Sequence, residues 1–221
     1  MFVIPCKYAK GSPIVDCVKS IHSHHPDERI VVVDSDSDEK EYFSELDSLD
    51  CVEILDVKNR YREFGALRES YRKYESESRY VLMHDTVILK RDIEEFISKD
   101  AACFMYFPES TIHGSREYEY FKSVLSKTSY ESHVSSYLGA FGSMVSVSSS
   151  YIKNLESKGL LSTFSPGDKW ESQMSERIVG ICMLQDGIDL SKSTIEGDFL
   201  SRFHQVHSDQ LTHFKKVFMG R

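Results

Sequence analysis

Hydrophobic and polar residues follow two different periods along the first hundred positions. Short runs rich in β-branched residues are typical of strands that are buried on both faces of a sheet. Between these runs, apolar residues recur three and four positions apart, as they do on one side of a helix. The runs predict strands at 2–6, 29–34, 51–57 and 79–85, and the spaced positions predict helices at 12–26, 61–76 and 91–99.

This alternation of strands and helices predicts the fold class. It indicates an α/β domain with a central, mostly parallel sheet flanked by helices, of the Rossmann-like kind. The second half is less regular and predicts strands at 101–107 and 143–147 and helices at 116–125 and 170–187. Ligands of such sheets bind beyond the carboxyl ends of the strands. Polar residues at these ends are therefore the first candidates for a site.

Composition narrows the class of protein. The chain has 221 residues, of which 40% are hydrophobic, so one core and one domain are expected. The net charge is −8 without a dense run of Lys and Arg, which argues against a nucleic-acid partner. No apolar run approaches the roughly 20 residues of a membrane span, and the first residues read as a strand instead of a signal peptide. We expect a cytoplasmic, soluble protein.

Two aspartates follow buried runs at predicted strand ends. Asp34 follows "VVV", and Asp85 stands between "YVLMH" and "TVIL". A carboxylate in an apolar neighbourhood is costly unless another group pairs with it. Tyr8 follows the first strand and completes a group of three strand ends with polar or aromatic side chains.

The stretch "VVVDSDSDE" permits three interpretations. A haloacid-dehalogenase loop with Asp34 as nucleophile would need Thr or Val where Asp38 stands. A calcium loop would need Gly where Glu39 stands. The third interpretation is the end of a nucleotide-binding strand, in which Asp34 accepts hydrogen bonds from a base or a ribose. For Asp36, Asp38 and Glu39 we expect a solvated acidic loop.

Four stretches together resemble GT-A fold glycosyltransferases of the family-2-like kind. They are "FVIPCKYAKGSPIVDCVKSIHSHHPDERIVVVDSDSDE", "GALRESYRKYESESRYVLMHDTVIL", "YLGAFGSMVSVSSSYIKNL" and "WESQMSERIVGICMLQDG". They occur in the family's order and cover most of the chain. Where the family carries a D-x-D motif, this sequence has His84-Asp85-Thr86, so the motif is degenerate.

The resemblance implies a single domain over 1–221, with a nucleotide-sugar-binding half at 1–100 and an acceptor-binding half at 101–221. It implies transfer of a hexose or deoxyhexose from a nucleotide-sugar, a UDP-sugar in the first place, to a glycan, a glycoprotein or another hydroxyl acceptor in glycan biosynthesis. The expected donor-binding residues are Pro5, Tyr8, Asp34, Arg62, Arg68, His84 and Asp85.

A metal is expected at the departing diphosphate. Negative charge grows there when the sugar leaves, and Mn²⁺ or Mg²⁺ can neutralise it. The candidate ligands are Asp85 and, from the late histidines, His207 before His213. His84 ranks lower, because strand alternation would point it away from Asp85. Three late cations are candidates for a diphosphate clamp: Lys215, Lys216 and Arg221.

The acceptor hydroxyl needs a general base. Glu171 and Glu176, in the predicted helix at 170–187, are the candidates, and the resemblance favours Glu171. Gly142 and Trp170 are the expected acceptor-side residues, and Trp170 is as well explained by packing. Retaining and inverting outcomes both stay open.

Two other functions stay open. The degenerate motif also fits a nucleotide-sugar-binding module without activity, and Asp34 also fits a haloacid-dehalogenase-like phosphatase. A sugar-1-phosphate nucleotidyltransferase would need a glycine-rich loop after the first strand, which "PCKYAKGSP" does not provide.

Overall fold

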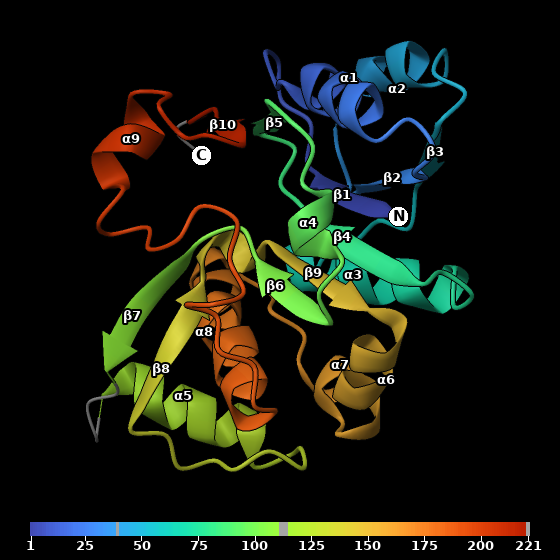
Figure 1. Cartoon of the computed structure of the whole chain (residues 1–221). Helices are drawn as coiled ribbons and strands as arrows, with labels where there is room; N and C mark the ends of the chain where they lie inside the picture. Colours follow the sequence, from blue (N-terminus) through green and yellow to red (C-terminus); the bar gives the residue numbers. More distant parts are fainter. Residues whose placement is uncertain (39, 111–114, 220–221) are drawn as a thin grey trace.

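The structure is a computed structural model that describes residues 1–38, 40–110 and 115–219. Its centre is a six-stranded sheet with the order β3-β2-β1-β4-β9-β6 (Figure 1). Strands β3, β2, β1 and β4 are parallel, whereas β9 is antiparallel to both of its neighbours. The predicted α/β fold with a mostly parallel sheet is confirmed. The strands are β1 (Phe2–Cys6), β2 (Ile30–Asp34), β3 (Val52–Leu55), β4 (Arg79–Leu82), β6 (Ala101–Cys103) and β9 (Val145–Ser148).

Alternate residues of the central strands are buried on opposite faces of the sheet. Val3 and Val33 belong to one core, and Ile4 and Val32 belong to the other. Because both faces are covered, these strands are continuous apolar runs in the sequence. Around the second core lie α1 (Ile14–His24), α2 (Glu41–Leu46) and α4 (Glu94–Ile97). Around the first lie α3 (Arg62–Lys73), α5 (Arg116–Leu125), α6 (Ser149–Ser157), α7 (Leu160–Thr163) and α8 (Lys169–Gln185).

A second, two-stranded sheet carries the long helix α8. It pairs β7 (Tyr106–Ser110) with β8 (Ser136–Ala140), and a short 3-10 helix, η1 (Phe141–Ser143), leads from β8 into β9. Gly180 lets α8 approach β8, since a Cβ atom there would lie 1.8 Å from the carbonyl oxygen of Leu138. This close packing fixes α8 beside η1.

The C-terminal segment returns to the turn that follows β4. After α9 (Phe203–His207), β10 (Phe214–Lys216) pairs antiparallel with β5 (Val87–Leu89), and Lys216 stands opposite Val87 (Figure 1). Residues 132 positions apart are thereby brought into hydrogen-bond contact at this turn.

Three predicted elements differ from the observed ones. The strand expected at 79–85 ends at Leu82, because a turn closed by a 3.1 Å hydrogen bond from the Val87 N–H to the His84 carbonyl follows it. The strand expected at 101–107 is divided between β6 and β7, which belong to different sheets. The helix expected at 91–99 is a single turn, α4.

Two residues named in the sequence analysis, Glu39 and Arg221, lie outside the described residues. Within residues 1–38, 40–110 and 115–219, no helix combines the length and the apolar character that crossing a membrane requires.

Candidate functional site

Asp34, at the end of β2, is fully buried and accepts hydrogen bonds from its own loop. The Tyr42 hydroxyl donates to Oδ1 at 2.7 Å, and the Ser37 N–H and the Lys40 ammonium donate to Oδ2 at 3.2 and 3.0 Å. Burial alone would raise the pKa of Asp34, but these hydrogen bonds outweigh it and lower the pKa. Asp34 anchors the loop after β2. The loop itself supplies the donors to this carboxylate, a geometry that disfavours the predicted contact with a base or ribose.

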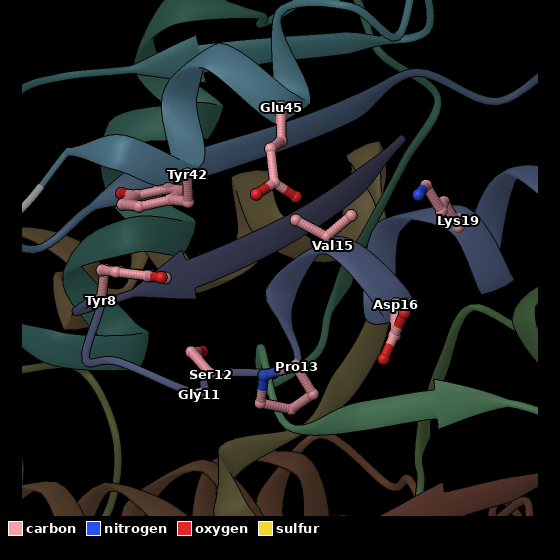
Figure 2. Close-up of a pocket in the computed structure, with 9 residues that line it drawn as sticks. All are labelled: Tyr8, Gly11, Ser12, Pro13, Val15, Asp16, Lys19, Tyr42 and Glu45. Carbon is pink, nitrogen blue, oxygen red and sulfur yellow. The ribbon is translucent and has the colours of Figure 1, made fainter.

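A cavity of about 250 Å³ opens beside the carboxyl end of β1 (Figure 2). The stacked rings of Tyr8 and Tyr42, with centroids 4.7 Å apart, form part of its wall. Ser12 connects the cavity to the next strand end, because its hydroxyl donates to Oδ2 of Asp85 at 3.3 Å. The lining consists of Tyr8, Gly11, Ser12, Pro13, Val15, Asp16, Lys19, Tyr42 and Glu45.

His84 contacts two segments that are distant in the sequence. Its Nε2–H donates to the Gly142 carbonyl at 2.7 Å, and its Nδ1 accepts from the Lys216 ammonium at 2.7 Å. Burial, together with the charge of Lys216, lowers the pKa of His84 to about 4, so the imidazole is neutral. Both His84 and Asp85 act on Lys216, His84 through this hydrogen bond and Asp85 through its charge.

Lys216, from β10, is the cation of this site. Besides its bond to His84, its ammonium donates to Oγ1 of Thr86 at 2.6 Å. Burial lowers the pKa of Lys216 to about 8, against the opposing charges of Asp85 and Glu63. The side chain is therefore mostly protonated at neutral pH.

Asp85 is paired by residues of its own chain. It is 8% exposed, accepts from the Ser12 hydroxyl, and also accepts a hydrogen bond from the Cys6 thiol. Among the charged groups that act on Lys216, Asp85 has the largest effect. The carboxylate that the sequence places in apolar surroundings is thus matched to a lysine ammonium.

Two glutamates from different helices complete the group. In the first turn of α3, Glu63 places Oε1 at 3.7 Å from Nε2 of His84 and accepts from the Ser172 hydroxyl at 2.7 Å. In α8, Glu176 accepts a hydrogen bond from the backbone N–H of Gly142. Burial, with a smaller contribution from Glu63, raises the pKa of Glu176 to about 7. A carboxyl group with this pKa is suited to accept a proton at neutral pH.

We call this group the His84 cluster. The side chains of His84 and Glu63 are 21% and 22% exposed, so a ligand can reach them from solvent. The cluster has one lysine cation and three carboxyl groups around a neutral imidazole. Its members are Glu63, His84, Asp85, Thr86, Gly142, Glu176 and Lys216.

Gly142 fits this place for two reasons. Its φ of +65° is a conformation that L side chains rarely adopt. A Cβ atom there would also lie 2.7 Å from Cε1 of His84. The glycine expected on the acceptor side therefore lies in direct contact with the imidazole.

Glu171 is engaged at the start of α8. Its Oε2 accepts from the Gly167 N–H at 2.6 Å, and its own N–H donates to the Asp168 side chain at 2.8 Å. The Tyr120 hydroxyl also hydrogen-bonds its carboxylate. These contacts make Glu171 part of the cap of α8, and the geometry favours Glu176 as the base. The preference for Glu171 stays a prediction of the resemblance, which these contacts do not favour.

Trp170 lies next to Glu171 and has two aromatic or cationic neighbours. The Arg116 guanidinium lies 4.0 Å from the ring centroid, and the Tyr120 ring packs edge-on at 4.9 Å. These contacts favour the packing interpretation of Trp170.

Arg62 and Arg68, the two basic residues of α3 expected to bind the donor, differ in exposure. Arg62 is exposed at the N-terminus of α3. Arg68 is buried, donates to the Ser165 hydroxyl at 2.9 Å, and stacks over the Tyr61 ring at 4.8 Å. Arg68 therefore ties α3 to the segment before α8.

Pro5 lies within β1 opposite Val33 and is partly exposed.

The late histidines lie apart from Asp85 in their described contacts. His207 stacks on Phe218 with centroids 4.3 Å apart and lies 4.3 Å from the Phe203 ring. His213 is bound to the buried Glu196 at 2.9 Å. Around His207 runs a row of rings, Phe141, Phe199, Phe203, His207 and Phe218, which begins beside Gly142 and which we call the aromatic row.

A divalent ion does not fit beside Asp85. Two neutral ligand atoms on the residues that flank Asp85, Nδ1 of His84 and Oγ1 of Thr86, both accept hydrogen bonds from the Lys216 ammonium. A metal ion there would meet a positive charge and would find these atoms already engaged.

One group in the described part of the chain has metal-ligand composition. It is formed by His25, Asp92 and Glu94, whose candidate ligand atoms lie within 4.8 Å of one another. Nε2 of His25 already accepts from the Ile93 N–H at 3.3 Å, and Asp92 accepts from the Glu94 N–H at 2.6 Å. His25 follows the last residue of α1 and is buried.

Comparison with solved structures finds likenesses at low sequence identity. A galactosyltransferase, LgtC, in complex with donor and acceptor sugar analogs, is 10% identical with a TM-score of 0.46, over 81% of this chain and 70% of that one. S. aureus TarS 1–349 in complex with UDP is 10% identical with a TM-score of 0.46, over 80% of this chain and 54% of that one. HddC from Yersinia pseudotuberculosis is 13% identical with a TM-score of 0.43, over 69% and 78%.

No family model matches the sequence, and no curated protein matches it. At the identities found, the likeness concerns the path of the chain alone, and function has to be argued from side chains.

Sequence reasoning missed two members of the His84 cluster, Glu63 and Thr86, and did not single out Lys216. Glu63 reads in the sequence as an ordinary helix-start acid, and Thr86 as a strand residue. Lys216 was one of three candidate cations for the diphosphate, and only its pairing with the β5 turn distinguishes it.

Proposed function

We propose that the protein transfers a sugar from a nucleotide-sugar to a hydroxyl acceptor. The observation that supports this most strongly is the presence, in one cluster at the carboxyl edge of a parallel sheet, of a lysine ammonium held by His84 and of a partly buried glutamate whose pKa is raised to about 7. The first group can stabilise a leaving diphosphate, and the second can accept the proton of a hydroxyl. Transfer from a nucleotide-sugar needs both.

The donor is proposed to bind in the half formed by 1–100, across the edge where β1, β2 and β4 end. The nucleoside packs in the cavity beside Tyr8, and the diphosphate extends toward Lys216, which β10 contributes from the other half. The loops after β1 and β3 and the start of α3 add exposed cations at this edge, which suits a dianionic group. These are Lys7, Lys10, Lys58, Arg60 and Arg62. We take UDP-sugars as the first donors to test.

The reaction exchanges one bond to the anomeric carbon for another. The bond from that carbon to the diphosphate oxygen breaks, and the electron pair stays on the departing nucleoside diphosphate. The acceptor oxygen bonds to the same carbon, and its proton passes to the carboxylate of Glu176. The neutral His84 holds Lys216 in place through Nδ1 and is itself oriented by the Gly142 carbonyl.

The acceptor is proposed to be a glycan or another hydroxyl compound that lies on the 101–221 half. Phe141 directly precedes Gly142, and the aromatic row continues from it to Phe203 and Phe218, which are 52% and 49% exposed. Exposed rings present apolar faces on which the C–H faces of sugars can pack. This row therefore runs from the proposed base to the surface.

The test is a donor panel assayed with the purified protein. UDP-sugars, then other nucleotide-sugars, are incubated with and without simple glycoside acceptors, and release of nucleoside diphosphate is measured. Wild-type protein is expected to release nucleoside diphosphate from at least one donor. Glu176→Gln is expected to bind UDP but not to release nucleoside diphosphate from that donor. Nucleotide binding by wild type with no turnover of any donor would support the inactive binding module instead.

The phosphatase alternative is not supported by the structure. Its nucleophile would be Asp34, which has no exposed surface and whose two oxygens accept three hydrogen bonds. A substrate phosphorus atom has no path to this carboxylate.

A further inference from the structure

We propose that the ammonium of Lys216 binds the donor diphosphate in the position that a divalent metal ion would otherwise take, so that transfer proceeds without a metal. This inference rests on the proposed function and specifies how its leaving group is stabilised. It replaces the expectation that Asp85 and His207 hold Mn²⁺ or Mg²⁺.

The first support is the position of the ammonium. Nζ of Lys216 lies 2.7 Å from Nδ1 of His84 and 2.6 Å from Oγ1 of Thr86. His84 and Thr86 flank Asp85, which is the carboxylate with the largest effect on Lys216. The cation is thus held at the turn after β4 by the side chains of that turn.

The second support is the donor set that remains for a metal. Mn²⁺ and Mg²⁺ prefer several oxygen ligands, and the residue two places after His84 is a threonine whose hydroxyl accepts from Lys216. His207, the other expected ligand, stacks between Phe203 and Phe218. An ion could enter only by displacing the ammonium.

The third support is hydrogen-bond capacity. An ammonium has three protons, and within the described residues Lys216 donates two of them, to His84 and Thr86. The third can be donated to a phosphate oxygen. Lys216 is partly exposed, and its neighbour His84 is 21% exposed, so such an oxygen can approach from solvent.

The fourth support is the negative charge that develops on the leaving group, which an ammonium in contact with it can stabilise. When the anomeric C–O bond breaks, the nucleoside diphosphate gains one negative charge on the oxygen that keeps the electron pair. A fixed, partly desolvated cation stabilises this charge more in the transition state than in the bound donor. Lys216 remains protonated throughout, since the proton of the acceptor passes to Glu176.

The experiment compares nucleotide binding and donor turnover in excess EDTA with the same measurements in added Mn²⁺ or Mg²⁺. It is done with wild type, Lys216→Met and Lys215→Met. Lys215, a clamp candidate in the sequence, is a matched control because its side chain alternates to the other side of β10 from Lys216, is exposed, and pairs with Asp209 at 3.4 Å instead of joining the His84 cluster. Far-UV circular dichroism and thermal unfolding check that each variant is folded.

We expect wild type to bind UDP and turn over donor equally well in EDTA and in Mn²⁺. Lys216→Met should lose turnover by about 100-fold or more, the size typical of removing one preorganised donor to a developing anion. Lys215→Met should behave as wild type. If Lys216→Met does not fold, the wild-type comparison alone decides.

Three results would overturn the inference. UDP binding or turnover by wild type that needs Mn²⁺ or Mg²⁺ would show that an ion displaces the ammonium, while the proposed transfer would stand. Unchanged turnover by folded Lys216→Met in EDTA would show that Lys216 is not the cation. Absence of any nucleoside diphosphate binding, with or without metal, would remove the proposed function together with the inference.

Discussion

Asp34 and Asp85 look alike in the sequence, and the structure uses them differently. Each follows a buried strand at the same edge of the central sheet. Asp34 is enclosed by Ser37, Lys40 and Tyr42, all within eight positions of it. Asp85 belongs to a cluster that, besides its neighbours His84 and Thr86, draws residues from α3, η1, α8 and β10.

The difference lies in where the partners come from. When all the hydrogen-bond donors to a carboxylate come from its own loop, the carboxylate stabilises the conformation of that loop, and distant segments are not needed for these bonds. A carboxylate whose partners come from distant segments is assembled only in the folded state, and the Lys216–His84 contact joins residues 132 positions apart. We therefore assign stability to the Asp34 loop and chemistry to the His84 cluster.

The largest expected effect is that of Glu176→Gln. It removes the proposed base and should lower kcat by about 10²- to 10⁴-fold, the usual contribution of general base catalysis. Steady-state release of nucleoside diphosphate in the presence of acceptor measures it. Glu171→Gln is the matched control on the same helix and should retain activity, with a loss of about 1 kcal/mol of stability at most from the weakened cap. The reverse ranking would restore Glu171 as the base.

Asp85→Asn and Asp34→Asn should have opposite consequences. Asp85→Asn is expected to lower kcat/KM by on the order of tenfold, because Lys216 loses its strongest charge partner. Asp34→Asn should leave kcat near wild type and reduce the free energy of unfolding by about 1–3 kcal/mol, because buried donors lose their acceptor. Denaturant unfolding and steady-state kinetics, measured on both variants and on wild type, distinguish the two effects. Loss of activity in Asp34→Asn at full stability would break the contrast between the two aspartates.

Gly142→Ala tests the contact between η1 and the imidazole. The added Cβ would lie 2.7 Å from His84 at a φ of +65°, so both the backbone and the ring must shift. We expect a stability loss of about 1–2 kcal/mol from the backbone and a further loss of kcat. Gly187→Ala is the control, since its φ is +80° and nothing lies within 4 Å of the added atom. It should show the stability loss with kcat unchanged.

The pH dependence is the smallest effect. Glu176 must be deprotonated to act, and burial raises its pKa from 4.5 to about 7, so activity should rise as the pH passes 7. Lys216 must be protonated, and burial lowers its pKa to about 8 against the charges of Asp85, Glu63 and Glu176, so activity should fall above 8. A pH profile of kcat/KM measures both limbs. An acid limb near 4.5 would indicate a solvated carboxylate as the base.

The strands of the central sheet could be predicted because they are continuous apolar runs, and such a run indicates a buried strand without knowledge of the rest of the fold. Helix α8 was predicted within two residues at each end, since Met174, Ile178 and Ile181 mark its buried face. The break between β6 and β7 was missed, because Phe104 and Met105 are buried and apolar although they belong to neither strand.

The site was only partly predictable. Asp85, Gly142 and Glu176 were named from the sequence, because strand ends, glycines and helix acids can be recognised locally. The contacts of His84 with Gly142 and Lys216 could not be predicted, because they depend on where β4 ends and on segments distant in the sequence. The importance of Lys216 follows from the pairing of β10 with β5, a contact for which the residues around Lys216 carry no local signal.

The central claim is that a diphosphate rests against Lys216 and His84 without a metal. A crystal structure of the protein grown with UDP in excess EDTA tests it most directly. We predict a β-phosphate oxygen about 2.8 Å from Nζ of Lys216, with His84 still bonded to both Lys216 and Gly142. A diphosphate bound elsewhere, with Lys216 still closed onto His84 and Thr86 and no phosphate near it, would contradict the account.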